Sequence, residues 1–381
     1  MYFCKKEINM KKLFILFSAL VTIVACSSSD DNGDTTGGSN YDRKLLLTNW
    51  ADNIIIPSYV NYQAKIKVVA TNITAFNASP SEANLLTVRT SWLEAYKAYQ
   101  YVAIYSFGKS EEINLKESAN TYPTNAAGID ANISVGGYDL TLLSQLDKQG
   151  FPALDYLING LGTTDASIVS YYSTNANAAN YQKYLTDVVT RLQTTADAVL
   201  ADWNSGYRAT YIANSGTSVS SSVNVTTNNF VKNLEKNVRS GKLGIPAGVF
   251  SGGVKFPEKV EAYYKNDVSK DLLNTAVQAS QDFFNGKHFN SATTGEGLKS
   301  YLDYVKAVRS GQQLSTIVDN QFTASLTANA ALNASFSNQI NSDNSKMLAA
   351  YDALQQNVVY MKLDMMQALN ITIDYVDGDG D

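Results

Sequence analysis

Helical spacing of apolar residues is the feature that most constrains the fold of this chain. The clearest case is the segment 178–203, in which apolar residues recur three or four positions apart and cover one helix face: Leu185, Val188, Val189, Leu192, Ala196 and Val199. The final segment, 342–370, repeats this pattern. A short strand is expected only at 370–376. The sequence therefore predicts an all-α protein whose helix faces supply the core.

The chain has 381 residues, which is long enough for two domains with separate cores. A stretch rich in Ser, Gly, Asn and Thr, 204–222, interrupts the helical pattern and marks a boundary. We predict two packed helical bundles, 42–206 and 223–381, joined by a linker at 207–222. Further helices are expected at 42–77 with a kink at Pro57, and at 82–107, 225–241, 256–264, 269–285, 294–311 and 313–335.

The beginning of the chain has the pattern of a bacterial lipoprotein signal. Lys11 and Lys12 precede an apolar run, 13–24, which is too short to cross a bilayer as a mature helix. The run leads into Ile-Val-Ala-Cys, which resembles a lipobox ending at Cys26. We predict a signal peptide at 1–25, a lipidated Cys26 and a flexible tether at 26–41.

This lipid would attach the protein to the outer membrane, facing either the periplasm or the cell surface. Asp30 and Asp31 follow three serines directly after Cys26. This arrangement resembles the export signal of surface lipoproteins of Bacteroidota, although a solvated linker in the periplasm is the alternative. The formal net charge of −5 makes nucleic acid an unfavourable partner.

The segment 150–160 is expected to form a short apolar helix. Leu154, Leu157 and Ile158 share one helix face, and Pro152 suits a first turn because its missing N–H would have no helical partner there. The only carboxylate in this helix is Asp155.

The same segment resembles the signature Gly-x-His-x-x-Glu of the imelysin family, also called M75 peptidase-like. Gly150 matches the signature, Pro152 stands where the family has His, and Asp155 stands where it has Glu. The resemblance spans most of 42–377 and implies two helical bundles and a lipoprotein of the Bacteroidota type. It also implies a role in iron or haem uptake, or the metallopeptidase activity of the family name. Proline has no side-chain donor or acceptor, so we expect no peptidase activity.

Carboxylates remain as candidate ligands for iron or another divalent metal, the cofactor that the resemblance suggests. Asp155 is the first candidate, with a helix-surface or inter-helix acid as the alternative. Glu258 and Glu261 would be neighbours on the predicted helix and could share one ion. Lys259, Lys265 and water can satisfy them equally, and we prefer this interpretation. Asp364 faces a Met-rich stripe and needs a partner, which is expected to be Lys362, Arg309 or an ion.

Three functions are consistent with these observations. The first is a binding protein for a small molecule, haem or metal, acting in iron or haem acquisition. The second is a metallopeptidase of the M75 type, and the third is a surface adhesion or scaffold protein. The chain has a single histidine, His288, so a His-rich metal site is excluded. We expect the binding protein, because the peptidase would need the histidine that Pro152 replaces.

Overall fold

The computed structural model describes residues 41–376. All of them fall within one compact unit, Gly38–Asp381. Helices make up most of this part of the chain, and its strands form a single two-stranded hairpin. None of its helices is long and apolar enough to cross a lipid bilayer. The protein is therefore all-α, as the helical spacing predicts.

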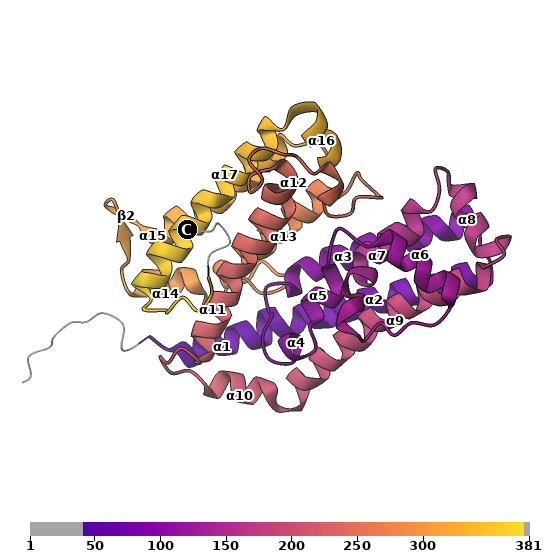
Figure 1. The fold of residues 1–381 in the computed structure, drawn as a ribbon. Helices are drawn as coiled ribbons and strands as arrows, with labels where there is room; N and C mark the ends of the chain where they lie inside the picture. Colours follow the sequence, from indigo (N-terminus) through magenta and orange to yellow (C-terminus); the bar gives the residue numbers. More distant parts are fainter. Residues whose placement is uncertain (1–40, 377–381) are drawn as a thin grey trace, which may run out of the picture. The chain divides into compact units, whose positions relative to one another are not determined.

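The first part of the chain is organised around three long helices. Its elements are α1 (Arg43–Asn49), η1 (Trp50–Ile55), α2 (Ile56–Ala78), α3 (Glu82–Val102), α4 (Lys109–Glu112), α5 (Leu115–Asn120), α6 (Ala126–Val135), η2 (Leu143–Lys148), α7 (Gly150–Asp155), η3 (Tyr156–Gly160), α8 (Asp165–Ser173) and α9 (Ala178–Asp202). α2 packs against both α3 and α9, and Figure 1 shows the three helices side by side. α5 and α7 cover this group at one side.

The second part is built around a continuous helical stretch formed by α11 and η5. Its elements are η4 (Trp203–Tyr207), α10 (Arg208–Ala213), α11 (Ser222–Lys232), η5 (Asn233–Gly244), α12 (Ile245–Ala247), η6 (Pro257–Lys259), α13 (Ser269–Phe284), α14 (Leu298–Tyr304), β1 (Val308–Arg309), β2 (Gln312–Gln313), α15 (Leu314–Ala330), α16 (Phe336–Asp343), α17 (Ser345–Val359), η7 (Tyr360–Met365) and α18 (Met366–Ala368). α17 packs against η5 and α15, while α13 also contacts α3. The division into two bundles at 207–222 stays a prediction.

Several predicted helices are confirmed with close boundaries. The helix expected at 178–203 is α9, which ends at Asp202. The segment 42–77 is helical from Arg43 to Ala78 as α1, η1 and α2, and Pro57 follows the π-helical turns of η1. Apolar spacing predicts both helices, because buried residues repeat along one face of each helix.

Three predicted elements are wrong. Only η6 is helical within 256–264, and the backbone then turns through Ala262 at φ 56°. The helix expected at 294–311 forms only from Leu298 to Tyr304, because the backbone leaves the helical region at Lys306, where φ is 53°. Ser310 and Gly311 then form the turn between β1 and β2. No strand forms at 370–376, where the backbone N–H groups of Thr372 and Asp374 bond to asparagine side chains of α11 instead.

Aromatic packing fixes α7 against α3. The Phe151 ring stacks on Tyr96 with ring centroids 4.5 Å apart, and Trp92 Nε1 donates a 3.1 Å hydrogen bond to the Phe151 carbonyl. Gly150 has φ 79°, and a Cβ there would lie 2.3 Å from the Ala119 carbonyl oxygen of α5. The glycine is therefore required for the close approach of α7 to α5.

Candidate functional site

The signature helix α7 holds Pro152 and Asp155 in buried positions. Pro152 lies in the first turn, as expected, and the helical stretch continues through η3 to Gly160. The Asp155 side chain points away from water, since its exposure is only 1%. Asp155 is therefore an acid enclosed between elements and does not lie on a helix surface.

Three N–H groups surround the Asp155 carboxylate. Oδ2 accepts a 2.8 Å hydrogen bond from the Tyr264 backbone N–H, and Oδ1 accepts one of 2.9 Å from the Lys265 backbone N–H. Asn159 Nδ2 donates a third, also 2.9 Å, to Oδ1. The carboxylate therefore ties α7 to residues 260–268, which we call the return segment.

Burial raises the pKa of Asp155 to about 7 from an ordinary value of 3.8. The hydrogen bonds from Tyr264, Asn159 and Lys265 act in the opposite direction because they stabilise the charged form. Asp155 is thus the carboxyl of this region whose protonation state changes near neutral pH.

The residues at the signature do not fit the divalent metal that the resemblance implies. Pro152 offers no donor atom, and both oxygens of Asp155 already accept hydrogen bonds from the protein. Within residues 41–376, no three His, Cys, Asp or Glu side chains are grouped as metal ligands would be. The Asp155 side chain acts as a buried hydrogen-bond acceptor for backbone N–H groups.

A small cavity of about 180 Å³ lies beside the signature helix. Pro152 and Asp155 form one wall, and the return segment forms another with Tyr263 and Tyr264. Glu258 also lines it and is exposed.

Glu258 and Glu261 are not helix neighbours, so the arrangement in which they would share one ion is not formed. η6 ends at Lys259, and Glu261 turns inward to 1% exposure while Glu258 stays at the surface. Glu261 pairs with the buried ammonium of Lys242 and accepts a 2.8 Å hydrogen bond from Asn120 Nδ2. Burial lowers the pKa of Lys242, and its attraction to Glu261 acts in the opposite direction.

Asp364 finds one of its three expected partners. Arg309 of β1 forms an ion pair with the carboxylate at the end of the final helical stretch. Lys362, the other protein candidate, instead pairs with Glu235 at 3.0 Å. Cys26, the predicted lipid attachment residue, lies outside the described residues.

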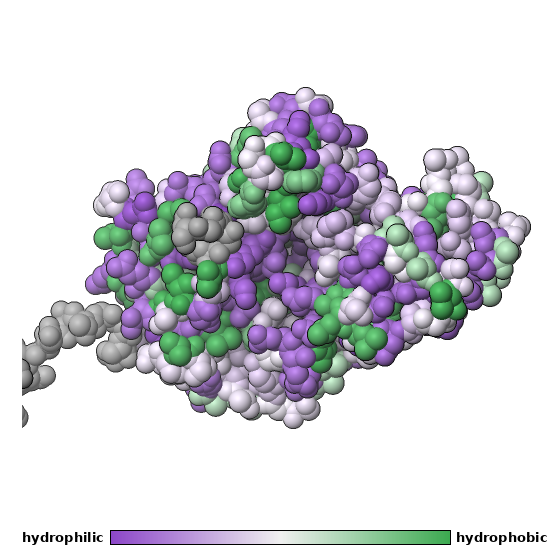
Figure 2. Space-filling model, in the orientation of Figure 1, coloured by the Kyte–Doolittle hydropathy of each residue, from purple (hydrophilic) through white to green (hydrophobic). Residues whose placement is uncertain are grey.

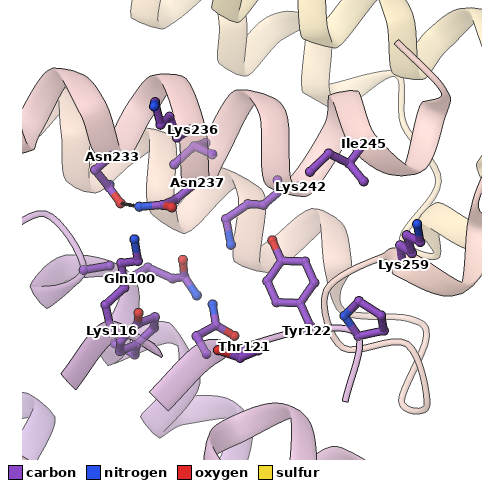
Figure 3. A pocket seen from close by; sticks show the side chains of 16 residues that line it. Gln100, Lys116, Thr121, Tyr122, Asn233, Lys236, Asn237, Lys242, Ile245 and Lys259 are labelled. Atoms are coloured by element: carbon purple, nitrogen blue, oxygen red, sulfur yellow. Dashed lines mark hydrogen bonds between the residues drawn. The ribbon is translucent and has the colours of Figure 1, made fainter. Parts of the chain in front are cut away.

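A larger cavity of about 310 Å³ opens between η5 and the α3–α5 region, and the sequence analysis did not find it. Figure 2 shows a hollow near the middle of this face with mainly hydrophilic residues around it. Four lysines line the cavity together with amide side chains, namely Lys116, Lys236, Lys242, Lys259, Gln100, Asn120, Asn233 and Asn237. In Figure 3, Lys242 reaches from the helix toward Gln100 and Tyr122.

This cavity continues into a neighbouring one of about 110 Å³. The two share Lys116, Asn233, Lys236 and Asn237, and the second adds Lys232. We call the two cavities together the lysine cleft. Among residues 41–376, no Asp or Glu side chain lines either cavity. Tyr122 and Pro123 separate the cleft from the smaller cavity beside Asp155, since they line both.

The arrangement defines an all-α protein with a buried, hydrogen-bonded carboxylate on its signature helix and a lysine-lined cleft next to it. The family model described as Imelysin (Peptidase_M75) matches residues 55–360, which is most of the chain. The chain belongs to the imelysin family.

Relatives with known structures share the fold. A crystal structure of a protein described as an iron-regulated protein A precursor from Parabacteroides distasonis ATCC 8503 superposes with a TM-score of 0.72 at 16% identity, covering 88% of this chain and 98% of the other. An imelysin-like protein from Psychrobacter arcticum 273-4 gives a TM-score of 0.69 at 16% identity, covering 88% and 97%.

One sequence relative is iron-regulated protein A of Synechococcus elongatus. It is 21% identical over 240 residues, which span 61% of this chain and 63% of the relative. The match thus covers less than two thirds of that protein's length.

Proposed function

We propose that this protein is an imelysin-family binding protein of iron or haem acquisition, without peptidase activity. Membership of the imelysin family and the similarity to proteins described as iron-regulated protein A support an iron-related role. In this proposal iron or haem is the cargo. The lysine cleft is the binding site, and the signature helix is part of its supporting structure.

The proposal depends on the difference between the two cavities that Tyr122 separates. On one side, three hydrogen bonds engage the Asp155 carboxylate. On the other side lies a cavity of about 310 Å³ rich in polar donors, a volume within the range of small-molecule sites. The cleft offers polar donors for a ligand. At the signature, Pro152 has no donor atom and the Asp155 carboxylate is already engaged by three hydrogen bonds.

Attachment to the outer membrane through Cys26 is part of the proposal. It rests on the basic start, the apolar run 13–24 and the lipobox-like Ile-Val-Ala-Cys. A lipid anchor would keep the binding unit, Gly38–Asp381, close to the membrane through the tether at 26–41.

The test uses protein produced from Ser27 onward, which retains the whole compact unit Gly38–Asp381. Calorimetry measures binding of haem and of ferric iron presented as its citrate complex, and a fluorogenic peptide library with added zinc measures cleavage. Saturable binding of haem or ferric citrate without peptide cleavage supports the proposal. Zinc-dependent cleavage, or the absence of binding to both iron compounds, would overturn it.

A further inference from the structure

We propose that the lysine cleft selects small ligands that carry several carboxylate or phosphate groups. This inference deepens the proposed function, because it rests on the cleft being the binding site. It implies that iron enters the cleft within an anionic complex that brings its own metal ligands.

The first argument is the positive charge of the cleft. The Lys236 and Lys259 ammonium groups lie over the rings of Tyr375 and Phe256, at 5.6 and 3.9 Å from the ring centroids. Lys232, Lys236 and Lys259 form no ion pair with any carboxylate in the described part of the chain. Lys116 pairs at 3.3 Å with Glu117, and Lys242 pairs with Glu261. Acidic residues outnumber basic ones, 35 to 30, in the whole sequence, so the cleft reverses the overall sign of charge.

The second argument is a buried amide that faces the cleft. Asn233 is 4% exposed and lines both cavities. Its Oδ1 accepts a 2.9 Å hydrogen bond from Asn237 Nδ2, drawn in Figure 3. Its own Nδ2 has no acceptor among residues 41–376. This N–H group is open to the cleft, where an oxygen atom of a ligand would serve as its acceptor.

The third argument is the placement of the cations on different walls. Lys232 and Lys236 are one helical turn apart on the α11–η5 stretch, Lys116 comes from α5 and Lys259 from η6. One carboxylate or phosphate cannot meet cations on three walls, whereas a ligand with several such groups can. Hydrogen bonds from ammonium groups to charged oxygens are about twice as strong as those between neutral groups.

A bare metal cation suits this cleft poorly. Lysine ammonium groups repel a cation, and ferric iron prefers anionic oxygen ligands. Neither cavity supplies a carboxylate. A nucleic acid strand is also disfavoured, because the overall net charge is −5 and the cavity has a volume of only about 310 Å³.

Calorimetric titrations of the protein from Ser27 onward test the inference with three probes: metal-free citrate, ferric citrate and pyrophosphate. The variants are Lys236→Gln and Lys259→Gln, each of which removes one cleft charge. Lys67→Gln is the matched control, because Lys67 is exposed on α2 and lines neither cavity. Thermal unfolding confirms that each variant is folded.

We expect at least one probe to bind, with about a tenfold loss of affinity in each cleft variant, which corresponds to about 1.4 kcal/mol. Lys67→Gln should change affinity less than twofold, and added salt should weaken binding. Tighter binding of ferric citrate or citrate identifies a polycarboxylate source, and tighter binding of pyrophosphate identifies a phosphate source.

The inference is overturned if no probe binds, or if the cleft variants bind as tightly as Lys67→Gln. Its failure is distinguishable from failure of the proposed function. If haem binds equally tightly to both cleft variants, the role in iron acquisition stands, but the selectivity of the cleft for anionic groups is contradicted. Citrate or pyrophosphate binding without affinity for haem or ferric citrate would confirm the anion site and contradict the role in iron acquisition.

Discussion

The Asp155 carboxylate is joined to Tyr264 by a 2.8 Å hydrogen bond from the Tyr264 backbone N–H to Oδ2. The two residues are 109 positions apart in the sequence. This contact, with its neighbour at Lys265, attaches the signature helix to the return segment 260–268. The carboxylate at the family's glutamate position therefore holds two distant parts of the chain together.

Asp155→Ala should lower the free energy of unfolding by about 2–4 kcal/mol. The substitution leaves the backbone N–H groups of Tyr264 and Lys265 without their acceptor, and each such group costs about 1–3 kcal/mol when buried. Urea unfolding measures the change. Asp352→Ala is the control, since Asp352 is exposed on α17 and should change stability by less than about 0.5 kcal/mol. Equal losses in both variants would refute the capping role.

The raised pKa of Asp155 should give stability a specific pH dependence. Burial moves its pKa from 3.8 to about 7 in the folded protein. Between these values the folded state holds a proton that the unfolded state has released, so stability falls as pH rises from about 4 to 7. The slope contributed by this one group reaches about 1.4 kcal/mol per pH unit.

Unfolding free energies between pH 4 and 8 test this dependence when the protein is compared with Asp155→Asn. The amide does not titrate, so the difference between the two curves isolates Asp155 from the other carboxyls. A difference that stays constant across this range would show that Asp155 does not titrate there.

The buried pair of Lys242 and Glu261 should be coupled energetically. Glu261→Ala leaves the Lys242 ammonium buried without its counter-ion and should cost about 3–5 kcal/mol. Lys242→Met combined with Glu261→Gln removes both charges and keeps an acceptor for Asn120, so it should cost clearly less. A double-mutant cycle by urea unfolding, built from Lys242→Met and Glu261→Gln, measures the coupling, and strictly additive effects would contradict it.

Cys26→Ala should release the protein from the membrane fraction of its source cells. The prediction rests on the lipobox-like sequence before Cys26, which lies outside the described residues. Fractionation followed by immunoblotting compares the variant with Cys4→Ala, which removes a cysteine upstream of the predicted cleavage point. Membrane retention of Cys26→Ala would exclude the lipid anchor.

The sequence predicts the helices well where apolar spacing is long and regular. α9 and the stretch Arg43–Ala78 were found because a buried face repeats over many turns. The segment 256–264 also has helix-forming residues, but the backbone N–H groups of Tyr264 and of the next residue, Lys265, bond to Asp155 instead. Long-range hydrogen bonds of this kind leave no trace in local spacing.

The lysine cleft was missed for a similar reason. Lys116, Lys236 and Lys259 come from three elements that are distant in the sequence, and no motif links them. A partial signal is the spacing of Lys232 and Lys236, which lie one helical turn apart on the α11–η5 stretch. That signal becomes informative only when the opposite wall of the cleft is known.

Metal content tests most directly the central claim that the signature carboxylate is structural and that binding occurs elsewhere. The protein from Ser27 onward and Asp155→Asn are purified from iron-supplemented medium, analysed by elemental mass spectrometry and titrated with iron, zinc and calcium. The account predicts no metal that depends on Asp155, and a stability advantage of the protein over the variant that falls as pH rises from about 4 to 7. A stoichiometric metal ion present in the protein and lost in Asp155→Asn would contradict it.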